Sequence, residues 1–204
     1  MSKPLSPGRL EAFSDGVIAV IITIMVLELH VPSKDISNIE GLHALLPLFL
    51  VYLLSFVQTG IYWVNHHYLV DDLKHVTHGI LWSNLAFLFC LSLIPFATTW
   101  IGTRGISPFS VSLYSLTCAL PAVAWIVLST TICRNSGQPL AGSPILQVTS
   151  SAFYLGAIPV SYHSPSLALG MIAIVAVLWL IPPKKIVERT RALSAAKQPH
   201  SGPR

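Results

Sequence analysis

The first predicted helix opens with Arg9-Leu-Glu-Ala-Phe13-Ser14-Asp15-Gly16 and runs without a break into Val17-Ile-Ala-Val-Ile-Ile-Thr-Ile-Met-Val-Leu27. The stretch therefore places charged residues at the mouth of an apolar helix of membrane length. An ionisable group inside or at the edge of a spanning segment costs about 3 kcal/mol unless it is paired or faces water, so such groups tend to mark function. We expect the first helix to carry functional residues.

The composition is that of a membrane protein. Of 204 residues, 53% are hydrophobic and 10% are charged, and the mean hydropathy is +0.68, whereas soluble chains are about 25% charged. Crossing a bilayer takes roughly 17 to 25 apolar residues. Six such runs are present, at about residues 13–29, 43–64, 79–101, 108–132, 145–162 and 166–181. The sequence predicts an all-α membrane protein with six transmembrane helices, the last two forming a tight hairpin.

The basic residues predict the orientation in the membrane. An even number of spans places both termini on one side, and Lys and Arg accumulate on the cytoplasmic side. Only Lys34 and Arg104 fall on the side opposite the termini. The other ten of the twelve Lys and Arg residues fall on the same side as the termini: Lys3, Arg9, Lys74, Arg134, Lys184, Lys185, Arg189, Arg191, Lys197 and Arg204. Both termini are therefore expected in the cytoplasm.

The chain is expected to form one transmembrane domain over residues 1–193, followed by a disordered cytoplasmic tail over 194–204. The basic residues of this tail are typical of a segment beside anionic lipid, and no nucleic-acid partner is expected. Three cysteines, Cys90, Cys118 and Cys133, lie in or at the ends of predicted spans without metal-ligand spacing. They are expected to be free thiols.

One stripe of the first helix allows two interpretations. At 100° per residue it comprises Val20, Thr23, Ile24 and Leu27, extended toward the cytoplasm by Gly16 and Phe13. Ser14 and Asp15 point roughly 120° to 140° away from Val20. Such a stripe is most often a packed helix interface. If several copies met on an axis, it would instead form apolar rings that gate by dewetting and a ring of hydroxyls that replaces part of an ion's hydration shell.

A second group of polar residues follows the second predicted span: Trp63-Val-Asn65-His66-His67, and then Asp71, Asp72, His75 and His78. On a continuous helix, residues 67, 71, 75 and 78 would share one face, a spacing that could bind a divalent metal. The rival function is therefore a metal-coupled membrane transporter or a metalloenzyme that uses residues His66 to His78. The sequence favours the simpler interpretation, in which these histidines cap helix ends or contact lipid headgroups.

A polar network is predicted at one depth near the cytoplasmic side. Its members come from the first three spans, where unpaired polar groups are costly in lipid. They are Arg9, Ser14, Asp15, His67 and Asn84, with Trp82 beside them. We expect the network to lock three helices together.

These residues resemble a known family. The motif Arg9-x3-Phe13-Ser14-Asp15 is followed by Trp63-x2-His66-His67, Trp82-x-Asn84 and Leu93-Ile-Pro95-Phe96. The chain is similar to bacterial members of the transmembrane protein 175 family of potassium channels. The resemblance covers residues 9 to about 101, and the later helices resemble the family only in number and length.

The resemblance implies a homotetramer in the plasma membrane, with the first helix of each copy lining a central pore and no P-loop selectivity filter. In that arrangement Val20 forms the apolar constriction, Thr23 contributes to the preference for potassium, and Ile24 and Leu27 form further apolar layers. Family constrictions are usually Ile or Leu, so the smaller Val20 implies a wider gate. No catalytic residue, metal or cofactor is implied; the partners are a potassium ion, the lipid bilayer and other copies of the chain.

Overall fold

The computed structural model describes residues 6–31, 37–71, 73–136 and 143–180. Within these ranges the chain forms α1 Pro7–Val26, α2 Asn38–Val70, α3 His78–Leu91, α4 Ile94–Arg104, α5 Pro108–Ser136, α6 Pro144–Ser161 and α7 Pro165–Leu180. The prediction of an all-helical fold is confirmed. The predicted tail, residues 194–204, lies outside the described residues.

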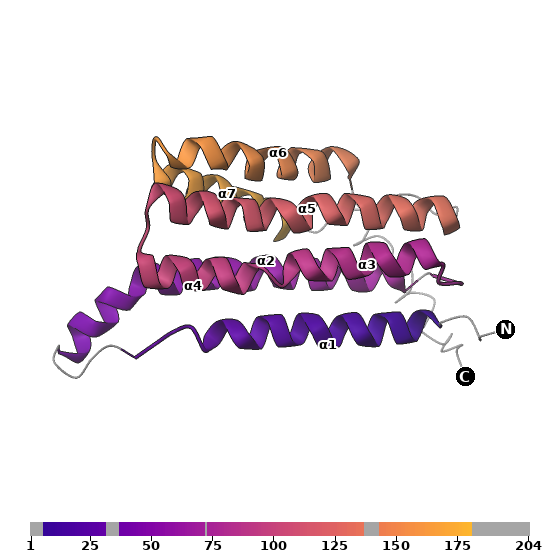
Figure 1. The fold of residues 1–204 in the computed structure, drawn as a ribbon, viewed down its shortest axis with the longest axis horizontal. Coiled ribbons are helices and arrows are strands. Elements are labelled where there is room, and N and C mark those ends of the chain that lie inside the picture. The colour runs from indigo at the N-terminus through magenta and orange to yellow at the C-terminus, as the bar shows by residue number, and fades with distance from the viewer. Residues whose placement is uncertain (1–5, 32–36, 72, 137–142, 181–204) are drawn as a thin grey trace, which may run out of the picture.

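The helices lie side by side in alternating directions (Figure 1). α5 occupies the middle and contacts α3, α4, α6 and α7, while α1 lies along one edge and packs on α2, α3 and α4. α6 and α7 are joined by residues 162–164, as expected for the predicted hairpin. Because α1 lies at the edge, one of its faces is left without a helix of the same chain.

The third predicted span is divided into two helices. α3 ends at Leu91 and α4 begins at Ile94, with Pro95 in the first turn of α4. Proline lacks a backbone N–H and fits best at the start of a helix, where that group has no partner in any case. Taken together, α3 and α4 still form a stretch of 27 residues that is apolar enough to cross a membrane.

Two other segments in the described ranges meet the same length and hydropathy requirement, Asn38–Val70 and Pro108–Ser136. α2 begins earlier than predicted because Ser37 and Glu40 form a capping box: the Ser37 hydroxyl accepts from Glu40 N at 3.3 Å and Ser37 N donates to the Glu40 carboxylate at 3.2 Å. The six-span count and the side on which the termini lie remain predictions.

Several polar groups in the interior are paired across helices. The Ser55 hydroxyl lies 2.8 Å from Thr98 Oγ1 and 2.9 Å from the Tyr114 hydroxyl, joining α2, α4 and α5. Gln58 Nε2 donates to the Tyr154 hydroxyl at 2.6 Å and joins α2 to α6. In a bilayer such groups find no water, so the protein must satisfy them itself.

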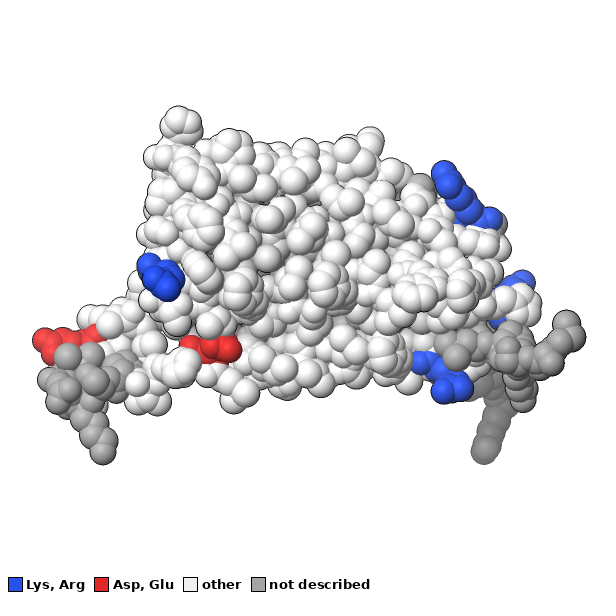
Figure 2. Space-filling view, in the orientation of Figure 1, with Lys and Arg blue, Asp and Glu red and all other residues white. Residues whose placement is uncertain are grey.

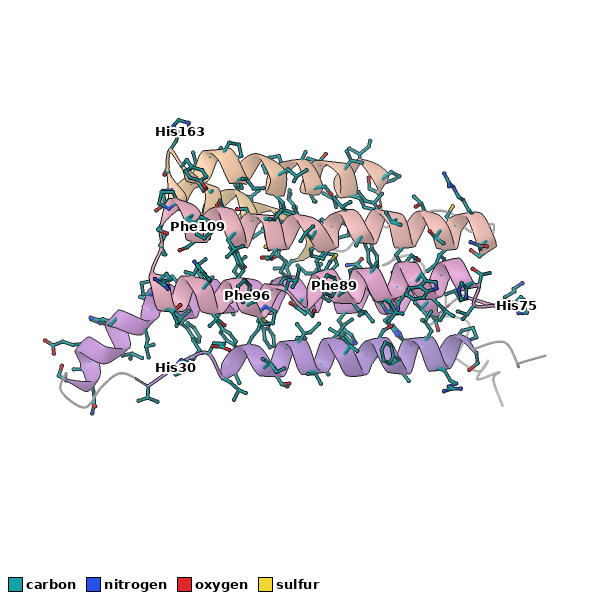
Figure 3. The ribbon with its side chains drawn as sticks, in the orientation of Figure 1. His30, His75, Phe89, Phe96, Phe109 and His163 are labelled. Atoms are coloured by element: carbon teal, nitrogen blue, oxygen red, sulfur yellow. The ribbon has the colours of Figure 1, made fainter. Side chains whose placement is uncertain are left out.

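Charged side chains gather at the two ends of the bundle. The face shown in Figure 2 carries Lys and Arg near both ends and Asp and Glu near one end, with none of them across the middle. In Figure 3, His30 and His163 lie at one end, His75 lies at the other, and Phe89 and Phe96 lie between them. This distribution suits a bundle whose middle is surrounded by hydrocarbon.

Candidate pore-lining helix and its polar anchor

α1 has one packed face and one exposed face. The packed face consists of Leu10, Ser14, Ile18, Ile21 and Met25, which follow one another at intervals of three and four residues and are buried. On the other side, Phe13 is 53% exposed, Val20 54% and Leu27 72%. Gly16, Thr23 and Ile24 are exposed with them. The stripe predicted from periodicity is therefore the uncovered side of α1.

An open groove runs beside this stripe. α1 contributes Phe13, Gly16, Val20 and Ile24, and the junction between α3 and α4 contributes Ser92 and Pro95. The groove has a volume of about 680 Å³ and is almost wholly apolar in its lining. Within a single chain, four residues of the stripe, Phe13, Gly16, Val20 and Ile24, line this space.

Thr23 is the hydroxyl residue of the stripe. Its Oγ1 lies 3.0 Å from the carbonyl oxygens of both Ala19 and Val20, to which it donates within its own helix. A hydroxyl has one hydrogen and two lone pairs. With the hydrogen engaged by the helix, the exposed Thr23 oxygen can still offer lone pairs to a cation.

Three buried side chains hold α1 against α2 and α3; we call Ser14, His66 and Asn84 the polar anchor. All three are fully buried. Asn84 Nδ2 donates to Ser14 Oγ at 2.9 Å, and Asn84 Oδ1 lies 2.8 Å from His66 Nε2. The anchor thus places one side chain from each of three helices in a continuous hydrogen-bonded chain.

The direction of each hydrogen bond in the anchor follows from Ser14. Its hydroxyl donates to the carbonyl oxygen of Leu10 at 2.9 Å, so it can only accept from Asn84. The amide nitrogen of Asn84 therefore faces Ser14 and its oxygen faces His66, which requires a hydrogen on His66 Nε2. The imidazole stacks on Phe87 at an interplanar angle of 9°, and its Nδ1 has no hydrogen-bond partner among the described residues.

Two further contacts join α1 to α2 nearer the surface. Trp63 Nε1 donates to the Asp15 carboxylate at 3.0 Å. His67 Nδ1 lies 2.9 Å from Glu11 Oε1, forming an ion pair when the imidazole is protonated. Exposed ion pairs of this kind contribute about 0 to 1 kcal/mol, so the buried anchor is the stronger determinant of how α1 sits.

The structure brings together part of the predicted network. Ser14 and Asn84 form a hydrogen bond, as predicted. The histidine that contacts Asn84 is His66, whereas the predicted member, His67, contacts Glu11. Arg9 is exposed, and its side chain has no hydrogen bond or ion pair within the part of the chain that is described. Trp82 lies apart from the anchor and donates from Nε1 to His78 Nε2 at 2.9 Å.

The contacts of Glu11, Trp63 and His66 were not anticipated from the sequence. A usable signal existed, because His66 and His67 lie three and four residues after Trp63 and so lie on the same side of α2 as that ring. That spacing indicates that the three rings lie on one side of α2. It does not show which ring reaches Asn84.

The single helical face that the rival metal-binding hypothesis requires is not formed. α2 ends at Val70 and α3 begins at His78, so residues 67, 71, 75 and 78 do not lie on one continuous helix. His66 is engaged in the anchor and His78 accepts from Trp82. Among the described residues, which exclude Asp72, no group of three or more His, Cys, Asp or Glu side chains could hold a metal ion.

Known proteins similar to this chain are channels. A family profile described as the endosomal/lysosomal potassium channel TMEM175 matches residues 9–95, which contain α1 and the anchor. A protein of Chryseobacterium sp. (strain P1-3), described as a potassium channel, is 44% identical over 187 residues, which cover 89% of this chain and 96% of the relative. The human endosomal/lysosomal proton channel TMEM175 is 37% identical over 90 residues, covering 39% of this chain and 18% of the human protein.

A solved structure has the same fold. It is the crystal structure of a lysosomal potassium-selective channel TMEM175 homolog from Chamaesiphon minutus, with a TM-score of 0.68 and 27% sequence identity. The match covers 86% of this chain and 96% of that chain. The relatives are channels and not enzymes. By its sequence and its fold, this chain belongs to the TMEM175 family of membrane channels.

Proposed function

We propose that the protein is a potassium-permeable cation channel of the plasma membrane, and that four identical six-span protomers surround a pore lined by α1. The observation that carries this proposal is the exposed apolar face of α1, which lies opposite the face that packs on α2, α3 and α4. An apolar face that one chain leaves uncovered can be used by symmetric association of several chains. We infer potassium as the permeant ion from the relatives that are described as potassium channels.

The chemistry of the exposed face suits a narrow pore. In a tetramer, Val20, Ile24 and Leu27 form stacked apolar rings that resist wetting, and Thr23 forms a ring of four hydroxyls. Val20 is exposed in the single protomer and Thr23 keeps its lone pairs available. Val20 is the proposed constriction, and Thr23 is proposed to contribute to the preference for potassium. The ion moves down its electrochemical gradient, so no cofactor is required.

The polar anchor is proposed to set the rotation of α1. Ser14 lies six residues before Val20, which corresponds to about 120° around a helix. When Asn84 and His66 hold Ser14 on the packed side, Val20 is turned toward the open side. The anchor therefore acts on the pore through the orientation of α1 and does not contact the ion.

The orientation in the membrane is proposed from the basic residues. Arg9 lies in the first turn of α1, Lys74 follows α2 and Arg134 lies in the last turn of α5, and the directions of these helices bring the three positions to one end of the bundle. Basic residues accumulate on the cytoplasmic side. We place this end, with both termini, in the cytoplasm.

Cysteine accessibility tests the assignment of the pore. Val20 and Val123 are both valines on helix surfaces, 54% and 46% exposed in the protomer. In a background in which Cys90, Cys118 and Cys133 are replaced by Ala, a charged thiol reagent should block potassium flux through Val20→Cys, because the pore is wet during conduction. It should not affect Val123→Cys, which we expect to face lipid. An equal response at the two positions would contradict a pore lined by α1.

A further inference from the structure

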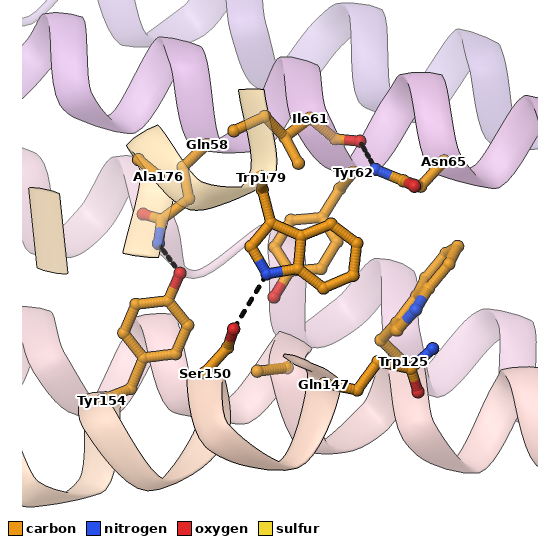
Figure 4. A pocket seen from close by; sticks show the side chains of 11 residues that line it. Gln58, Ile61, Tyr62, Asn65, Trp125, Gln147, Ser150, Tyr154, Ala176 and Trp179 are labelled. Carbon is orange, nitrogen blue, oxygen red and sulfur yellow. Dashed lines mark hydrogen bonds between the residues drawn. The ribbon is translucent and has the colours of Figure 1, made fainter. Parts of the chain in front are cut away.

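A small cavity lies inside the protomer, among α2, α5, α6 and α7 and apart from the exposed face of α1 (Figure 4). Its volume is about 30 Å³. The lining includes the polar groups of Gln58, Ser150 and Tyr154 and the rings of Tyr62, Trp125 and Trp179. Most of the lining surface is apolar, and polar atoms reach the cavity at only a few points.

Most polar groups in the lining have a partner within the protein. Trp179 Nε1 donates to Ser150 Oγ at 2.8 Å, Gln58 Nε2 donates to the Tyr154 hydroxyl, and Asn65 Nδ2 donates to the carbonyl oxygen of Ile61 (Figure 4). Trp125 differs from them. It is 3% exposed, and its Nε1 has no hydrogen-bond partner among the described residues.

The unpaired indole group restricts what can occupy the cavity. An indole N–H donates and cannot accept, so the occupant must offer a lone pair. A buried donor without an acceptor is destabilising, which favours occupation. The Tyr154 hydroxyl, which accepts from Gln58, still has its own hydrogen to donate, and Asn65 has its amide oxygen to accept with. The lining thus offers both donors and acceptors.

Charge and size restrict the occupant further. No Asp, Glu, Lys, Arg or His is among the described residues that line the cavity, and a charge buried without a counter-charge is strongly disfavoured. Water needs about 10 to 15 Å³ of cavity volume and two to four polar partners, whereas a ring the size of benzene occupies a cavity of about 150 Å³. The occupant is therefore neutral, small and able to form several hydrogen bonds.

We propose that this cavity is an internal hydration site that holds one or two water molecules, one of which accepts the Trp125 indole N–H. The water joins α5 to the polar side chains of α2 and α6 within each protomer. The site does not depend on the channel proposal, because none of its lining residues belongs to the exposed stripe of α1.

Nuclear magnetic resonance of the full-length protein in lipid nanodiscs tests the proposal. The chain has five tryptophans, so labelling with ¹⁵N-tryptophan gives five indole resonances, and Trp125→Phe identifies the one from Trp125 by its loss. If that variant does not fold, substitutions of the other four tryptophans identify the remaining resonance by elimination. In the wild-type protein, we expect a cross-peak between water and the Trp125 indole hydrogen, and none at the backbone amide of the fully buried Cys118.

Xenon under pressure provides a second measurement, since dry apolar cavities bind xenon. We expect no xenon-induced shift of the Trp125 indole resonance, because water occupies the cavity. Absence of the water cross-peak would overturn the proposal, whether or not xenon shifts the resonance. A cross-peak from the Trp125 indole to lipid acyl hydrogens in place of water would also overturn it.

Discussion

Replacing Asn84 with Ala should destabilise the protein measurably, because one side chain joins three helices. The substitution removes the bond from Asn84 Nδ2 to Ser14 Oγ and the bond from His66 Nε2 to Asn84 Oδ1, at 2.9 and 2.8 Å. It also leaves both ring nitrogens of the fully buried His66 without a partner among the described residues. A polar group that is buried without a hydrogen-bond partner lowers the stability of the folded state more than an exposed one does.

The expected magnitude follows from hydrogen bonds measured in membrane proteins. These average about 0.6 kcal/mol each and reach about 1.7 kcal/mol, so losing two of them predicts a loss of about 1 to 3 kcal/mol. The free energy of unfolding of reconstituted protein, measured by steric trapping or by titration with a denaturing detergent, checks this value. Asn135→Ala is the matched control, because the Asn135 amide is exposed and donates to Thr131 O in its own helix.

A double-mutant cycle isolates the contact between α1 and α3. Ser14→Ala and Asn84→Ala should be non-additive, with a coupling of about 0.6 to 1.7 kcal/mol. If Asn84→Ala lowered the stability no more than Asn135→Ala, or if the cycle gave no coupling, the polar anchor would not hold α1 and the reasoning would be refuted.

Three other substitutions test separate parts of the account. Thr23→Ala should lower the preference for potassium over sodium, seen as a shift of the reversal potential with mixed ions, while Thr23→Ser should preserve it; an unchanged reversal potential in Thr23→Ala would remove Thr23 from the selectivity mechanism. Gly105 ends α4 with φ of +76° and ψ of 175°, a region nearly exclusive to glycine, so Gly105→Ala should cost about 1 to 3 kcal/mol of unfolding free energy. Gly8→Ala is its control, since an added Cβ there meets open space, and equal effects would exclude backbone strain at Gly105. Glu11→Gln should lower the stability by less than about 1 kcal/mol, and that difference should disappear at high salt; a larger loss that persists in salt would show that the contact with His67 is not an ordinary exposed ion pair.

Much of the fold follows from local patterns in the sequence. Runs of apolar residues locate the helices because membrane-spanning backbone must satisfy its own hydrogen bonds. The two faces of α1 follow from its helical period: Ser14 is on the packed face and Val20 is on the exposed face.

Other features could not be predicted because they depend on how helices are rotated against each other. Pro95 indicates a kink in the third span but not the residues at which the helix is interrupted, and the structure interrupts it at Ser92 and Leu93, both of which keep right-handed helical backbone angles. His66 and His67 are adjacent, and only the rotation of α2 decides that His66 reaches Asn84. The metal-binding hypothesis failed for a related reason, since it required α2 to continue beyond Val70.

The decisive experiment measures potassium flux into liposomes that contain the purified, folded protein, with valinomycin as the positive control. We expect flux through the wild-type protein, faster flux through Val20→Ala because the apolar ring is widened, and unchanged flux through Val123→Ala. Absence of flux from correctly folded oligomer would contradict a potassium-permeable channel. Flux that Val20→Ala leaves unchanged would contradict a constriction at Val20 on α1.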